Sequence, residues 1–130
     1  MTEVMLDRLE GGPSLCAWFG GIPSFHDATL KELVLCQGAP GRLVAHTFQM
    51  TSEVDAEGYF LLTRHVVVTL TIFDVIEVQL SDFAETGVMY GLVIEQDAEG
   101  TLLKFDSSYG VHGCIKAKRV VVSFEPVKPI

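Results

Sequence analysis

The chain has 130 residues, of which 48% are apolar and 20% charged, a balance that excludes a wholly disordered protein. Its length suits a single domain, residues 1–130, with one buried core. Because 17 Asp and Glu outnumber 9 Lys and Arg, the net charge of −8 argues against direct binding of nucleic acid, which needs a cationic surface.

The first 24 residues predict a lid made of helix and loop. Glu3–Leu9 has the spacing of a short helix, and Ser14–Phe19 predicts a second one, with Ser14 as its N-cap and Gly20 as its stop. The N-terminus lacks the charged and apolar regions of a secretory signal, and no apolar stretch is long enough for a membrane helix. We therefore expect a cytoplasmic protein without a membrane segment.

Residues 25–126 predict a body of about seven short antiparallel strands. They are Leu30–Cys36, Leu43–Met50, Tyr59–Phe73, Val75–Leu80, Val88–Glu95, Thr101–Phe105 and Cys114–Glu125. Turn signals every 8–15 residues favour a mainly β fold, either a sandwich or one strongly curved sheet. Tyr59–Phe73 is long enough to bend, and its apolar edge leaves room for a homodimer.

Side-chain alternation assigns faces to two of these strands. Val66, Val68, Leu70 and Ile72 would share one face, with His65, Val67, Thr69 and Thr71 on the more polar one. In the next strand, Ile76, Val78 and Leu80 would lie on one side and Glu77 and Gln79 on the other.

Cysteine and histidine spacing predicts neither a disulfide framework nor a metal site. The three cysteines (Cys16, Cys36 and Cys114) are far apart and odd in number. The four histidines (His26, His46, His65 and His112) have no ligand spacing, and no serine lies in a nucleophile elbow. We therefore predict no cofactor and no enzymatic activity.

The most distinctive string is Pro23–Ala28, which holds Phe25, His26 and Asp27. Adjacent side chains of an extended segment point to opposite sides, so His26 and Asp27 would not converge on one atom. We expect structural roles: Phe25 in the core, His26 bonded to a backbone carbonyl and Asp27 holding a turn. A binding role, or catalysis with distant residues, stays open as an alternative.

Acidic residues crowd three predicted tips: Glu53, Asp55 and Glu57 on the first, Asp82 and Glu85 on the second, and Glu95, Asp97 and Glu99 on the third. Of these, we expect Glu53, Asp55, Glu57, Asp97 and Glu99 to face a partner first. Hairpin tips of an antiparallel fold can gather at one end, where they would attract a cationic partner. The alternative is that the tips are acidic only because turns are solvated.

Trp18–Ala28 (WFGGIPSFHDA) resembles the opening signature of the Immunity protein 50 family of bacterial polymorphic toxin systems. The resemblance continues through Arg64–Phe83 and Phe105–Val111, with Ile22 where members often carry Trp. It implies a cytoplasmic protein that neutralises a cognate toxin by direct binding. Many such toxins act on nucleic acids, so an acidic surface could fill a nuclease cleft as a phosphate mimic.

The second hypothesis is a small-ligand-binding or regulatory domain. Its pocket would lie between the sheet and the lid, lined by Trp18, Phe19 and Phe25, with His26 at the mouth.

Overall fold

The computed structural model describes residues 2–128, with the side chain of Phe60 left aside. The helical elements are a 3-10 turn, η1 (Leu6–Arg8), and one helix, α1 (Gly12–Phe19). The strands are β1 (Thr2–Val4), β2 (Thr29–Val34), β3 (Gly41–Val54), β4 (Phe60–Ser81), β5 (Val88–Asp97), β6 (Gly100–Tyr109) and β7 (His112–Pro126).

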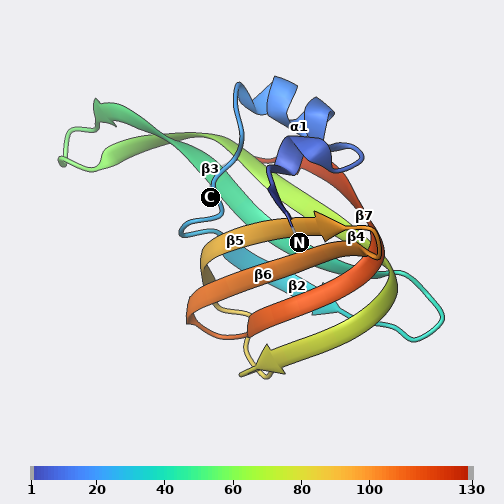
Figure 1. Cartoon of the computed structure of the whole chain (residues 1–130). Coiled ribbons are helices and arrows are strands. Elements are labelled where there is room, and N and C mark those ends of the chain that lie inside the picture. The colour runs from blue at the N-terminus through green and yellow to red at the C-terminus, as the bar shows by residue number, and fades with distance from the viewer. Residues whose placement is uncertain (1, 129–130) are drawn as a thin grey trace.

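All seven strands belong to one antiparallel sheet with the order β1-β5-β2-β3-β4-β7-β6. β5 also pairs with β6, so the strands from β2 to β7 form a ring that curls around its own core (Figure 1). This confirms the predicted mainly β fold, and the curved sheet is the form that it takes. We call this closed part of the sheet the body.

The inner face of the body is the hydrophobic core. Val66, Val68, Leu70 and Ile72 are each 0% exposed, which confirms the face predicted for the middle of β4. Leu43 and Ala45 of β3 face them from one side. Alternating aliphatic side chains fit a pleated surface that is buried on one side only, which is why this stretch forms central strands.

The N-terminal segment packs over one end of the body (Figure 1), with Leu6, Leu9, Leu15 and Phe19 buried against it. The predicted cap at Ser14 is wrong: α1 starts after Gly11, whose φ is 84°, and has proline in its first turn. Gly20, with φ of 83°, ends the helix as predicted.

The predicted helix over Glu3–Leu9 is wrong. Thr2–Val4 is a strand that pairs with Ile94–Gln96 of β5, and only the 3-10 turn follows. The outer edge of β5 is open there, because β2 pairs with β5 only near Val88. Backbone pairing along that edge outweighs a weak helical pattern in so short a segment.

β4 combines the two predicted strands Tyr59–Phe73 and Val75–Leu80 into one. The predicted number of seven strands is still reached, because β1 is an additional strand that was not predicted. Asp74 takes a left-handed φ of 55°, and the register with β7 shifts between Val75 and Glu77. This bulge bends the strand without ending it. Val78 then lies opposite the buried Ile115, on the inner face.

Candidate partner-binding site

A two-stranded ribbon projects from the body at the hairpin between β3 and β4 (Figure 1). β2 pairs with β3 only as far as His46, and β7 pairs with β4 only from Val66 onward. Residues 48–64, which we call the arm, therefore pair with one another alone. Both outer edges of the arm are left without a neighbouring strand in the described chain.

The arm exposes several large apolar side chains. They are Met50, Val54, Tyr59, Leu61 and Leu62, with exposures from 38% to 69%. Met50 and Leu62 lie directly opposite one another in the ribbon. Exposed apolar groups that cluster on one projection are typical of a surface that a partner covers.

The tip of the arm holds three carboxylates. Asp55 shapes the turn, because its Oδ1 accepts hydrogen bonds from the backbone N–H groups of Glu57 (2.9 Å) and Tyr59 (3.0 Å). Glu53 and Glu57 are exposed. Within residues 2–128 no Lys, Arg or His forms an ion pair with any of the three.

The second acidic tip, between β5 and β6, is held differently. Asp97 Oδ1 accepts from the N–H groups of Glu99 (2.8 Å) and Gly100 (3.1 Å). The Lys116 ammonium lies 3.6 Å from both Asp97 and Glu99. The Glu99 N–H above all, with help from Gly100 and Lys116, holds the pKa of Asp97 below its usual range. This tip therefore has its own counter-ion.

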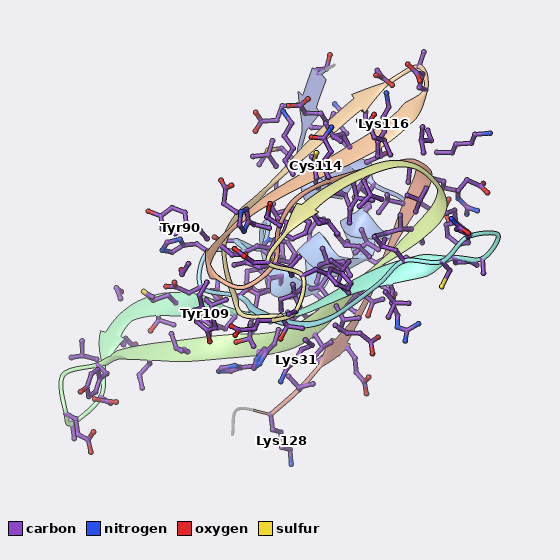
Figure 2. The ribbon with its side chains drawn as sticks, turned by 90° about the horizontal axis from the view of Figure 1, so that it is seen from below. Lys31, Tyr90, Tyr109, Cys114, Lys116 and Lys128 are labelled. Carbon is purple, nitrogen blue, oxygen red and sulfur yellow. The ribbon has the colours of Figure 1, made fainter. Side chains whose placement is uncertain are left out.

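The expectation that these two tips gather at one end is wrong. Thr101, beside the second tip, pairs with Ala117 of β7, and Ala117 in turn pairs with Val75 in the later half of β4. The arm begins at the opposite end of that strand. Figure 2 shows Lys116 near one end of the molecule and the arm at the other.

The Pro23–Ala28 string forms a turn against β5. Phe25 is 5% exposed, as predicted, and the Ala28 N–H donates to its carbonyl at 3.0 Å. His26 Nδ1 lies 3.0 Å from the carbonyl oxygen of Tyr90, so that nitrogen carries the proton and donates, again as predicted. The His26 ring also packs edge-on against the ring of Tyr90, with 5.0 Å between the ring centres.

Asp27 departs from its predicted geometry. Its φ of 65° turns the side chain toward His26, so that Asp27 Oδ2 lies 3.6 Å from His26 Nε2 rather than on the opposite side. The predicted side-chain bond to the turn is not formed within residues 2–128. The Asp27 backbone N–H instead donates to Met89 at 3.0 Å. Main-chain hydrogen bonds and the buried ring of Phe25 therefore hold this segment in its conformation.

The predicted pocket under the lid is mostly filled. Phe19 and Phe25 are buried, and Trp18 packs against Phe124 with 5.8 Å between ring centres. The cavity that remains beside His26 is about 230 Å³, below the range of about 300–1,000 Å³ typical of ligand pockets. A larger groove of about 790 Å³ lies elsewhere, between the β2–β3 turn and β4.

Sequence spacing missed one contact between histidines. His46 of β3 and His65 of β4 place Nε2 and Nδ1 3.0 Å apart, at the root of the arm. Burial, then the neighbouring His65 and Lys31, lowers the pKa of His46. Two histidines nineteen residues apart meet only because their strands pair, so no local motif marks them.

Among the remaining chemistry-bearing groups, His112 Nδ1 lies 3.8 Å from Asp82 Oδ2. The three cysteines are free, and burial together with Asp7 raises the pKa of the Cys16 thiol. In the described part of the chain no three His, Cys, Asp or Glu side chains converge as a metal site requires. None of its helices has the length and apolar character needed to cross a bilayer.

Comparison with protein-family models, with curated proteins and with solved structures gave no match.

Proposed function

We propose that this protein neutralises a cognate bacterial toxin in the cytoplasm by direct binding, and that the arm is its main contact surface. The observation that carries the proposal is the tip of the arm, where Glu53, Asp55 and Glu57 form no ion pair with described residues. Such a site favours a cationic partner. The resemblance of Trp18–Ala28 to an immunity-protein signature points to the same role.

The shape and composition of the arm fit a protein partner. A two-stranded ribbon is marginally stable alone, and here apolar side chains stay exposed along its length. A partner that buries Met50 and Leu62 would gain contact area, while the carboxylates at the tip would guide its approach. A cleft that binds nucleic acid is cationic by necessity, so a nuclease toxin suits this surface.

The histidines with a carboxylate nearby give little support to an enzymatic alternative. His26 and His112 each have Nδ1 engaged by a backbone carbonyl, of Tyr90 and Gly110 respectively. Both side chains are also well exposed, at 55% and 41%. The contacts of these two histidines are explained without a catalytic site, as a binding protein requires.

The test starts from the native host. The tagged chain is purified from it, and proteins that remain bound in stoichiometric amount are identified by mass spectrometry. A captured toxin is then expressed with this chain, and growth is measured. We expect Glu57→Lys, at the tip of the arm, to reduce protection.

The matched control is Glu99→Lys, which makes the same charge change at the other acidic tip. It should protect as the natural chain does. Equal protection by both variants, or a toxin that is neutralised without binding this chain, would contradict the proposal.

A further inference from the structure

The arm joins the body at a bulge in β4. The register of β3 and β4 shifts there, so that Phe48 faces two residues of β4, Arg64 and His65. Arg64 takes a left-handed φ of 49°, and a bulge of this kind bends the ribbon. Because no strand of the described chain flanks the arm beyond this point, the contacts at the bulge set the direction in which the arm projects (Figure 1).

Two side-chain contacts hold the bulge. Arg64 Nη1 donates to the carbonyl oxygen of Trp18 at 3.0 Å, which ties the arm to the last turn of α1. On β3, His46 Nε2 lies 3.0 Å from His65 Nδ1, and the ring of Phe48 packs 5.8 Å from that of His65. A guanidinium stays charged at every ordinary pH, so of these two contacts only the one between histidines can respond to acid.

The geometry of the two histidines fits a hydrogen bond and not a metal ion. Their ring centres are 5.2 Å apart and their facing nitrogens 3.0 Å, so the rings lie nearly end to end. Zinc binds an imidazole nitrogen at about 2.0–2.1 Å, and therefore does not fit on the line between these two nitrogens. An N–H of one ring that donates to the lone pair of the other does fit.

This hydrogen bond tolerates one added proton but not two. When one ring is protonated, it still donates to the neutral ring, and the charge strengthens the bond. When both rings are protonated, each of the facing nitrogens carries a proton and neither has a lone pair with which to accept. Two positive charges then stand in contact, so the rings repel and the bond is lost.

Cations around the pair make the second proton harder to accommodate. Burial above all, then His65 and Lys31 of β2, lowers the pKa of His46. Lys128 follows Val127, whose backbone N–H donates to the carbonyl oxygen of His65 at 3.0 Å. The surroundings of the pair therefore favour a state in which at least one ring is neutral.

The carboxylates on this face of the sheet do not compensate. Glu32 of β2 is paired with Arg42. Glu125 of β7 lies opposite Val67, which in turn lies opposite His46, so a whole strand separates Glu125 from the pair. No carboxylate of the described residues forms an ion pair with either ring. The repulsion in the doubly protonated pair is thus left without a counter-ion.

We propose that the His46–His65 pair is a pH-sensitive switch at the root of the arm, which fixes the direction of the arm until both rings are protonated. Uptake of the second proton then frees the arm to swing about the bulge, with the contact between Arg64 and Trp18 as its remaining attachment. The direction of the arm is a property of the free chain, so the proposal stands whether or not the arm binds a toxin.

Distances between spin labels on the arm and on the body test the proposal. Ala56→Cys at the tip of the arm and Ala98→Cys in the β5–β6 turn carry the labels, because both alanines are exposed, and serine replaces the three native cysteines. We expect one narrow peak of distances at pH 8. That peak should be lost at pH 5, well below the ordinary histidine pKa of about 6.5. Circular dichroism at both pH values would verify that the body stays folded.

Variants of single histidines assign the response to the pair. His46→Gln should keep the narrow peak at pH 5, because an amide can donate to or accept from His65 whatever the charge of that ring. The matched control is His112→Gln, the same change at a histidine paired with Ser81, at the other end of β4. It should lose the peak at pH 5 as the unsubstituted labelled chain does.

An NMR titration of the natural chain needs neither labels nor cysteine replacement. The ring C–H resonances of His46 and His65 should report two coupled steps, and the amide resonances of residues 48–64 should shift with the second. Amides of the arm that do not respond, a narrow peak that persists at pH 5, or a peak that His46→Gln fails to preserve would overturn the proposal. So would loss of the narrow peak at pH 8 on addition of a chelator, since a metal ion would then hold the pair.

Discussion

The arm and the body both contain β3 and β4, but they differ in how far the side chains of these strands are buried and in how many strands lie beside them. Within β4, Val68 is fully buried between β3 and β7, whereas Leu62 is 38% exposed and has a neighbour on one side only. The body uses its apolar side chains to hold the fold together. The arm leaves its apolar side chains in contact with solvent, so they add little to the stability of the folded chain.

The two acidic tips repeat this contrast. Asp55 and Asp97 each accept two backbone N–H groups, so both shape their turns in the same way. Only Asp97 also has a lysine, Lys116, within reach. Position in the fold therefore separates two turns that look alike in sequence, and this difference is the reason that we propose the arm as the partner-binding surface.

The largest expected effect compares one substitution in the two halves of β4. Val68→Asp would bury an unpaired charge in the core and should cost more than about 4 kcal/mol, enough to prevent folding. Leu62→Asp, on the arm, should leave the chain soluble with a nearly unchanged unfolding temperature. Thermal unfolding and soluble yield measure both. Normal folding of Val68→Asp would refute the placement of the core.

A smaller effect should separate the two turn aspartates. Asp97→Ala removes two hydrogen bonds and an ion pair from the body, so the unfolding temperature should fall by a few degrees. Asp55→Ala should only speed hydrogen exchange in the arm. Equal shifts in unfolding temperature would mean that the arm contributes to global stability.

Acid should weaken the same turn of the body. Because the pKa of Asp97 is lowered on folding, its stabilising effect is complete above the ordinary carboxyl pKa of about 3.9 and is lost as pH falls below that value. The difference in unfolding temperature between the natural chain and Asp97→Ala should therefore shrink in strong acid.

A still smaller effect belongs to the junction of arm and body, where His46 meets His65. Folding lowers the pKa of His46 below its ordinary 6.5, so the unfolded chain takes up the proton first. The free energy of unfolding should therefore decline as pH falls below about 6.5. His46→Gln should make that decline shallower in urea unfolding between pH 8 and pH 5. An unchanged slope would contradict the assignment.

Much of the body could be predicted from residue patterns. The alternation from Val66 to Ile72 identifies a half-buried strand, and Gly20 marks the end of α1. Phe25 and His26 were also placed correctly, because a buried ring and a histidine bonded to a carbonyl follow from local chemistry.

What sequence could not supply depends on pairing between distant residues. Glu3 joins a strand because β5 offers it an open edge, and His46 meets His65 through strand register. The acidic tips carry similar local patterns, and only the position of Lys116 on β7 distinguishes them. The groove beside Val78 exists because β3 ends its pairing with β4 early, which no local pattern reveals.

The central claim is that the carboxylates at the tip of the arm attract a cationic toxin. Stopped-flow association of the captured toxin with this chain tests it most directly. We predict a rate that falls steeply as salt is raised, and a rate about tenfold lower for Glu53→Lys with Glu57→Lys at low salt. Glu99→Lys should have a much smaller effect than Glu57→Lys alone. A rate that ignores both salt and the charge at the tip would contradict the account.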